Sequence, residues 1–271
     1  MTGRRLRTAV AAALFSGLLA SAPGGAIVNG EPPTDARFAA DSPWAVVLVR
    51  DDGPGICTGS LIAPRFVLTA AHCAGDGLTV LYGNRSREGA RRVPVREAIR
   101  HPQYTRQPIA YDLGLLRLAY PLRVRPLPIA SRVEAWDLVR PGGTATILGW
   151  GATVTGNRRP DLVHRAAIRS TDLRVVGTHI AYDTPTGGPC GGDSGGPLLV
   201  TGYDGRPVLV GVASITDGNL CAAGGGIAGY THVATMLDFI RAHVPDLPAR
   251  PPPLDFGRPA PARPGRPGES Q

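Results

Sequence analysis

Short apolar runs recur along the middle of the chain, each bounded by Gly, Pro, Asp or Asn. Runs of this length, rich in β-branched and aliphatic residues, are typical of β-strands. No helical periods lie between them, which favours antiparallel pairing in barrels or a sandwich over βαβ units. We therefore expect an all-β fold. The predicted strands cover residues 44–49, 66–69, 78–82, 113–118, 144–150, 197–200, 208–215 and 229–233.

The last of these runs passes into a different pattern. Apolar side chains recur there at helical spacing, at positions 233, 236, 237, 240 and 244. This spacing predicts a single helix that closes the ordered part of the chain and packs by its apolar stripe. Thr231 stands where a hydroxyl can cap the first turn.

The two ends of the chain differ from the part between them. Residues 1–26 hold three Arg, then an apolar run over 9–20, then small residues as far as Ala26. This is the order of a secretory signal peptide, with room for a very short pro-segment. The run is shorter than the roughly 20 residues needed to span a bilayer. We expect a secreted, extracellular protein without stable membrane insertion.

Residues 245–271 contain nine Pro and few large apolar side chains. Such a segment buries too little apolar surface to offset the entropy lost on ordering, so a disordered tail is predicted. The alternative is a proline-rich ligand or a cell-wall spacer. The folded domain is expected between the ends, at 27–244.

Composition and charge exclude several classes. The chain has 36 Gly and 27 Pro but no strict Gly-X-Y period and no sustained heptad, which excludes collagen and coiled coils. All 29 basic residues are Arg, and residues 27–244 hold 22 of them against 18 acids, a net charge of +4. A net charge this small argues against binding to nucleic acid. The densest basic stretch, 85–106, is predicted to be a solvated face.

The chain has four cysteines, at positions 57, 73, 190 and 221, and no CxxC motif. In an exported protein these favour two disulfides over a metal site. The spacing leaves three connectivities open. Pairing neighbours would close loops of 16 and 31 residues, each contributing about 3 kcal/mol.

Three segments carry side chains that packing alone explains poorly: 69–73 with His72, 112–116 with Asp112, and 192–197 with Ser194. A serine hydroxyl becomes a nucleophile when an imidazole takes its proton, and a carboxylate fixes the tautomer of that imidazole. The glycines around Ser194 indicate a backbone that needs unusual torsion angles and open access to the serine.

With three further motifs, these segments resemble the trypsin/chymotrypsin-like serine peptidase family, in its secreted, bacterial type. The further motifs are Ile-Val-Asn-Gly at 27–30, Gly-Trp-Gly at 149–151 and Tyr-Thr-His-Val at 230–233. The resemblance implies two six-stranded antiparallel β-barrels, at about 27–130 and 131–244, with the active site between them and a C-terminal α-helix. It implies no metal and no cofactor. The partners would be a protein or peptide substrate and a protein inhibitor, and the enzyme would be a monomer.

The resemblance assigns roles to individual residues. His72 would be the general base, Asp112 its orienting carboxylate and Ser194 the nucleophile that becomes acylated. The backbone N–H groups of Gly192 and Ser194 would form the oxyanion hole. Ser214 would donate a hydrogen bond to the carboxylate and border the substrate cleft. Since His72 must be neutral to act, activity is expected to fall as the pH drops through about 6 to 7.

The resemblance also selects the pairings Cys57–Cys73 and Cys190–Cys221. In the family, the α-amino group of the mature N-terminus pairs with the aspartate before the nucleophile, here Ile27 with Asp193. No Arg or Lys precedes Ile27. Cleavage after Ala26 by signal peptidase would therefore activate the enzyme on export.

The substrate pocket departs from the family. Gly188 stands where the members that cut after Arg or Lys have Asp, and Ile215 and Thr216 replace a common Trp-Gly pair. Ala228 takes a pocket position usually held by Gly. These residues predict cleavage after a small apolar residue.

Two other classes of protein would share parts of this pattern. A catalytically silent, protease-like binding protein would use the fold as a scaffold, but the intact triad and glycine-rich loop argue against it. An esterase of the α/β-hydrolase type needs its histidine after the serine, whereas His72 precedes Ser194.

Overall fold

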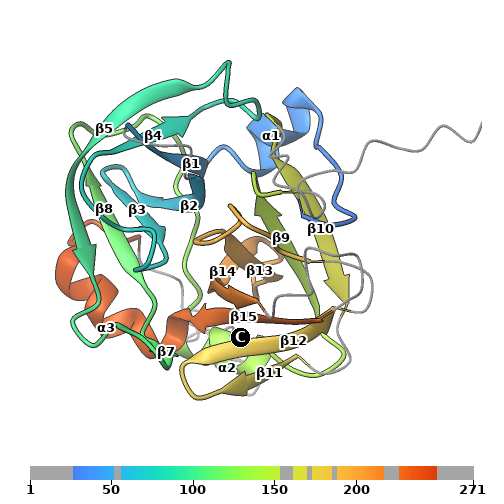
Figure 1. The fold of residues 1–271 in the computed structure, drawn as a ribbon. Helices are drawn as coiled ribbons and strands as arrows, with labels where there is room; N and C mark the ends of the chain where they lie inside the picture. Colours follow the sequence, from blue (N-terminus) through green and yellow to red (C-terminus); the bar gives the residue numbers. More distant parts are fainter. Residues whose placement is uncertain are drawn as a thin grey trace, which may run out of the picture.

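The computed structural model describes residues 27–51, 56–152, 161–169, 173–184, 188–216 and 226–248 (Figure 1). The elements, in chain order, are α1 (Asp35–Asp41), β1 (Ala45–Arg50), β2 (Ile56–Ala63), β3 (Phe66–Thr69), β4 (Leu78–Tyr82), β5 (Arg91–Arg100), β6 (Thr105–Arg106), β7 (Ile109–Ala110), β8 (Gly114–Leu118), α2 (Arg132–Leu138), β9 (Thr144–Gly149), β10 (His164–Arg169), β11 (Arg174–Val176), β12 (His179–Thr184), β13 (Pro197–Thr201), β14 (Pro207–Thr216), β15 (Gly226–His232) and α3 (Val233–His243).

The first half of the chain forms a closed antiparallel barrel in the order β1-β2-β3-β8-β5-β4. Strands β1 to β4 and β8 bury most of their side chains, because the barrel interior and the neighbouring half cover both faces. In β2, a Cβ on Gly59 would lie 2.7 Å from Val67 Cγ1. Glycine at this position thus lets β2 and β3 approach closely.

The second half forms a seven-stranded antiparallel sheet in the order β10-β9-β13-β14-β15-β12-β11. Its own core includes Ile147, Tyr182, Leu198, Val210 and Tyr230. The predicted all-β fold with a six-stranded barrel, a second β-sheet unit and a C-terminal helix is confirmed. The seventh strand, beyond the six expected, is the short β11 at the edge of the sheet, which pairs with β12.

Helix α3 returns from the second half to the first (Figure 1). Its buried residues, among them Met236, Leu237 and Ile240, belong to the same apolar core as the first barrel. The predicted stripe is therefore the packing face. The predicted cap was wrong. His232 is the residue before the helix, without a side-chain cap, and the Thr231 hydroxyl instead donates to the Asp112 carbonyl at 2.9 Å.

Two short helices add to the one expected. Helix α1 begins after Thr34, whose hydroxyl oxygen accepts from the Arg37 N–H at 3.2 Å. Helix α2 begins with a capping box in which Ser131 and Glu134 each accept the other's backbone N–H.

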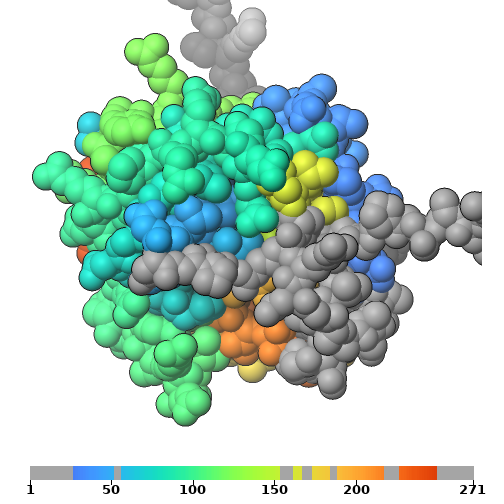
Figure 2. All heavy atoms as spheres, turned by 45° about the horizontal axis from the view of Figure 1, so that its top comes forward, coloured from blue at the N-terminus to red at the C-terminus, as the bar shows by residue number. Residues whose placement is uncertain are grey.

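Several bridges hold the two halves together. Glu31 pairs with Arg165, Ser86 with Leu162, and Ile129 with Leu209. In Figure 2 the yellow segment around residues 161–166 lies against both the blue N-terminal segment and the teal strand region of the first half. The candidate site residues come from both halves, so these contacts set their relative positions.

The basic stretch of β5 is mostly exposed, as expected of a solvated face. Arg92 in this strand forms an ion pair with Asp51, and Arg85, which precedes the strand, forms one with Asp35. Among the described residues, no helix is long and apolar enough to cross a membrane.

Candidate active site

A hydrogen-bonded chain joins three of the predicted site residues. His72 Nδ1 lies 2.7 Å from Asp112 Oδ2, and the Ser214 hydroxyl donates to the same oxygen at 2.7 Å. The His72 backbone N–H donates to Asp112 Oδ1 at 2.9 Å. His72 follows β3, Asp112 precedes β8, and Ser214 lies in β14. The fold thus brings together residues from both halves of the chain.

The Asp112 side chain is completely buried. Burial opposes its ionisation, but the hydrogen bonds and charge of His72 and the hydrogen bond from Ser214 outweigh burial and lower the pKa of the carboxyl. An ionised carboxylate can only accept hydrogen bonds, so Nδ1 of His72 carries the proton. Nε2 is then left as a proton acceptor.

The loop around Ser194 is held by backbone contacts on both sides. Gly195 N–H donates to the Ala213 carbonyl at 2.8 Å, and Ala213 N–H donates to the Gly196 carbonyl at 2.8 Å. Ser194 thus lies beside the strand that carries Ser214. Gly192 and Gly195 have φ of 106° and 80°, which favour glycine. Among the described residues, no partner accepts from the N–H groups of Gly192 and Ser194.

Ser194 is half-buried, and 24% of the His72 side chain is exposed. The hydrogen bonds of the described residues do not include one between the Ser194 hydroxyl and His72 Nε2. Such contacts often tighten only when substrate is bound.

Asp193 lies in a buried cluster of backbone N–H groups. Its carboxylate accepts from Gly151 at 2.8 Å, from Cys190 at 2.9 Å, and from the backbone N–H of Ile27. Burial nevertheless raises the pKa of Asp193 to about 7. A Cβ on Gly151 would lie 2.6 Å from Asp193 Oδ2. The Gly-Trp-Gly motif therefore leaves space for this carboxylate.

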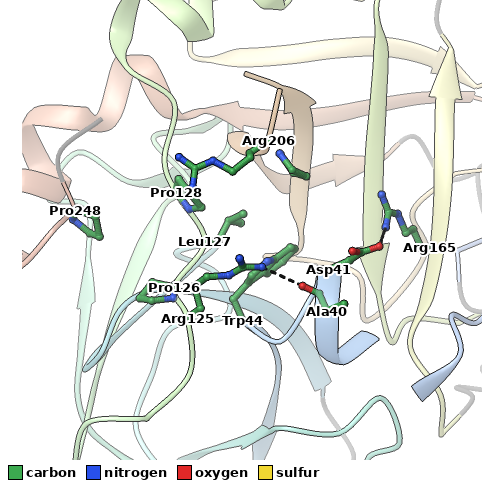
Figure 3. Close-up of a pocket in the computed structure, with 11 residues that line it drawn as sticks. Ala40, Asp41, Trp44, Arg125, Pro126, Leu127, Pro128, Arg165, Arg206 and Pro248 are labelled. Atoms are coloured by element: carbon green, nitrogen blue, oxygen red, sulfur yellow. Dashed lines mark hydrogen bonds and ion pairs between the residues drawn. The ribbon is translucent and has the colours of Figure 1, made fainter. Parts of the chain in front are cut away.

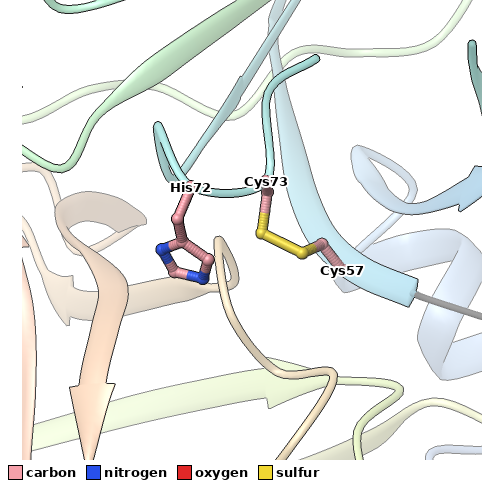
Figure 4. Close-up of side chains that lie close together, drawn as sticks. All are labelled: Cys57, His72 and Cys73. Carbon is pink, nitrogen blue, oxygen red and sulfur yellow. A yellow bond between two sulfur atoms is a disulfide. The ribbon is translucent and has the colours of Figure 1, made fainter. Parts of the chain in front are cut away.

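The Cys57–Cys73 disulfide lies beside His72, as Figure 4 shows. The pairing of these two cysteines is confirmed, and it tethers the loop that carries His72 to β2. Cys57, His72 and Cys73 cluster closely, but the two sulfurs are bonded to each other and offer no thiolate to a metal. The predicted partner of Cys190, Cys221, lies outside the described residues.

Of the predicted pocket residues, those at 214–216 lie in β14 and Ala228 lies in β15, whereas Gly188 lies between β12 and β13. Ile215 pairs with Gly229 and Thr216 with Ala228 across β14 and β15, so these side chains are neighbours. Ile215 is 40% exposed and Ala228 is buried. The Gly188 carbonyl accepts from Val28 N–H at 3.0 Å, which places it beside the N-terminal segment. Residues 185–187 and 217–225 lie outside the described part of the chain.

Two further residues near the site, Tyr182 and Thr58, carry no recognisable motif. Tyr182 is fully buried, pairs with Ala228 in the sheet register and stacks on Tyr230 with ring centroids 5.9 Å apart. Burial raises the pKa of both tyrosine hydroxyls. Thr58, in β2, contacts the Ser194 loop across the boundary between the halves. Tyrosine and threonine are common strand residues, so neither stood out.

Two hollows lie at different distances from this chemistry. A small one of about 110 Å³ is lined by His72, Cys57, Cys73, Leu48 and Arg50, among others. A larger one of about 440 Å³ lies between α1, residues 125–128 and the β13–β14 turn (Figure 3). None of the site residues lines the larger hollow, so volume does not mark the candidate site.

Comparisons with known proteins agree with this geometry. A model of the Trypsin family matches residues 27–240. A relative named Trypsin, from Saccharopolyspora erythraea, is 31% identical over 239 residues, which cover 80% of this chain and 98% of the relative. Human kallikrein-4 is 30% identical over 208 residues, or 69% of this chain and 78% of the relative. Human serine protease 56 is 33% identical over 254 residues, 84% of this chain but 40% of that protein. The chain belongs to the trypsin family of serine peptidases.

Proposed function

We propose that the protein is a secreted serine endopeptidase that hydrolyses peptide bonds through an acyl-enzyme on Ser194. The observation that carries this proposal is the buried Asp112 carboxylate, which accepts hydrogen bonds from both His72 and Ser214. Burying a carboxylate is costly unless it is paired, and here His72 and Ser214 both pair with it.

The reaction follows the mechanism known for the family. Ser194 Oγ attacks the carbonyl carbon of the scissile bond while its proton passes to His72 Nε2. His72 then gives that proton to the leaving amine, which departs and leaves an ester on Ser194. A water molecule attacks the ester and loses a proton to His72, which passes that proton to Ser194 Oγ as the bond to the serine breaks and the acid product leaves.

The negative charge on the substrate oxygen needs hydrogen-bond donors that are already in place. The N–H groups of Gly192 and Ser194 are proposed for this role. Their lack of an accepting partner among the described residues supports it, because a donor that is bound within the protein is not available to an oxyanion.

Cleavage after Ala26 is proposed as the activating step. Ile27 is buried and its backbone N–H already contacts Asp193. Its φ is 60°, a left-handed torsion that a β-branched residue adopts only at a cost of about 1 to 3 kcal/mol. That torsion exists only while residue 26 is attached. Cleavage would therefore release the strain and replace a neutral N–H by an ammonium beside Asp193.

A small apolar residue is proposed on the acyl side of the cut. Gly188 offers no anion, and the β-branched Thr216 lies directly opposite Ala228 in the sheet, where it takes up room beside the predicted pocket. The buried Tyr182 opposite Ala228 adds bulk on the same side. Among these described pocket residues, none carries a carboxylate that would pair with a cationic side chain.

Export is part of the proposal. It rests on the signal-like residues 1–26, and the Cys57–Cys73 disulfide supports an oxidising compartment.

The test is covalent labelling with a fluorophosphonate probe. The proposal predicts one label per chain on Ser194 and none in Ser194→Ala. Absence of labelling in a mature protein that starts at Ile27 would point instead to a silent binding protein.

A further inference from the structure

Thr58 connects the first barrel to the loop that carries Ser194. It lies in β2, next to Cys57, and is completely buried. Its hydroxyl donates to the Gly192 carbonyl at 3.1 Å, and its backbone N–H donates to the Ser194 carbonyl at 2.8 Å. The hydroxyl oxygen also accepts from Trp150 N–H at 3.3 Å. One residue of the first half thus contacts two carbonyls of the candidate oxyanion loop.

We propose that Thr58 is a positioning residue whose hydroxyl holds the oxyanion hole in shape from the first barrel. This inference rests on the proposed peptidase function and adds to it a residue that acts through Gly192 and Ser194 rather than on the substrate.

Four consecutive carbonyls of the loop, from Gly191 to Ser194, accept hydrogen bonds within the protein. The Gly191 carbonyl accepts from Ala152 N–H at 2.8 Å and the Asp193 carbonyl from Gly196 N–H at 2.9 Å. Thr58 holds the carbonyls of the other two residues, Gly192 and Ser194. Every peptide from Gly191 to Ser194 therefore has its oxygen bound on the protein side.

In a planar trans peptide, the C=O and N–H groups point in opposite directions. The N–H of Gly192 thus points away from Ala152, and the N–H of Ser194 points away from Gly196. Gly192 has a φ of 106° and no side chain, so its own torsion angles put little restraint on the peptide between Gly192 and Asp193, whose carbonyl Thr58 holds. The bond from the Thr58 hydroxyl supplies a restraint that glycine itself cannot.

Thr58 is also tied to its own surroundings. Its carbonyl accepts from the Thr69 hydroxyl at 3.0 Å, and Thr69 ends β3, shortly before His72. Hydrogen bonds through Thr58 therefore connect the loop that carries Ser194 to β3, the strand that precedes His72.

Thr58→Val tests this directly, because valine keeps the shape and removes the hydroxyl. Thr58→Ser, which restores the hydroxyl, is the rescue variant. The loss of one neutral hydrogen bond predicts a fall in kcat of about five- to tenfold with KM changed less than twofold. A peptide aldehyde, which forms an oxyanion in the site, is expected to bind more weakly by the same factor. Thr58→Ser is expected to recover most of both losses.

Thr79→Val is the matched control. Thr79 lies in β4 of the same barrel, is almost buried, and donates to Asp51 Oδ1 at 3.3 Å, away from the serine loop. We expect it to lower the unfolding temperature without changing kcat. Thermal unfolding of all three variants separates a loss of folded protein from a loss of turnover.

Two outcomes would overturn the proposal. One is a Thr58→Val variant that keeps kcat and aldehyde affinity. The other is a variant whose loss of activity is matched by Thr79→Val at equal loss of stability. Both require an active parent, so they differ from failure of the peptidase function itself, in which the unaltered protein neither turns over peptide nor labels on Ser194.

Discussion

The backbone N–H of Ile27 donates to the carboxylate of Asp193 while Ile27 is still within the continuous chain. The contact therefore precedes any cleavage. A neutral N–H is a weak partner for a buried carboxylate, and burial raises the pKa of Asp193 to about 7. Cleavage before Ile27 would place a positive charge at the same spot and favour the ionised carboxylate.

This difference gives a prediction for stability against pH. In the uncut chain the pKa of Asp193 rises from 3.8 to about 7 on folding, so its stabilising contribution is complete below about pH 4. The contribution is lost as the pH rises through 7. The mature form, with its ammonium, escapes that loss. The gap in unfolding temperature between mature and uncut protein is therefore expected to widen from pH 5 to pH 8.

The measurement is thermal unfolding of both forms, carried in a Ser194→Ala background to prevent self-digestion. Asp193→Asn is the control, since it removes the titrating group and should leave a gap independent of pH. A gap that stays constant while Asp193 is present would contradict the ion-pair account.

Asp112→Asn is expected to abolish most activity. The amide can present its NH₂ to His72 Nδ1, which favours the wrong tautomer and removes the base. The loss in kcat is expected to be about 10⁴-fold, the size known for the orienting carboxylate in this family. Ser214→Ala removes one donor to the same carboxylate and should cost about tenfold. Steady-state kinetics on a peptide substrate measures both losses in kcat. Equal losses in the two variants would contradict the larger role given to Asp112.

The disulfide beside His72 predicts a stability change. Replacing both Cys57 and Cys73 by Ser opens a loop of 16 residues and should lower the free energy of unfolding by about 3 kcal/mol. Urea unfolding measures it. Since the loop carries His72, kcat is expected to fall as well. An unchanged urea midpoint would show that the loop is held by packing alone.

Gly188→Asp tests the pocket. If Gly188 faces the substrate side chain, the added carboxylate should raise the rate of cleavage after Arg relative to Ala by at least about tenfold. Thr201→Asp adds the same charge at the exposed end of β13 and should leave the ratio unchanged. A series of peptides that differ only in the residue before the cut gives both ratios. In the unaltered protein, faster cleavage after Arg than after Ala, Val or Leu would reject the proposed preference.

The sequence predicted the parts of the fold whose pattern is local. The apolar runs at 66–69 and 78–82 became β3 and β4, and the helical stripe became α3. Strand β2 was not predicted because Gly59 and small polar residues interrupt its apolar pattern. Strand β5 was not predicted because its many Arg residues hide the apolar pattern expected of a strand in a barrel. Helix α2 was missed although Ser131 and Glu134 stand at capping-box spacing, a signal that was available.

The site residues also fall into two groups, those that local motifs predict and those that only the three-dimensional structure reveals. His72, Asp112 and Ser214 could be named from motifs, and the structure joins them across more than 100 residues of chain. Thr58 could not be named, because its role depends on which carbonyls the second half brings to β2. Thr231 was misassigned for a related reason: its hydroxyl contacts Asp112, a partner that helical spacing cannot reveal.

The central claim is that Ser194 is acylated during turnover. Active-site titration with a chromogenic ester, on mature protein whose first residue is verified as Ile27, tests it most directly. We predict a burst of one product equivalent per chain, followed by steady turnover, with the burst absent in Ser194→Ala and His72→Ala. Steady hydrolysis that continues unchanged in Ser194→Ala, or no turnover by the verified mature protein, would contradict the account.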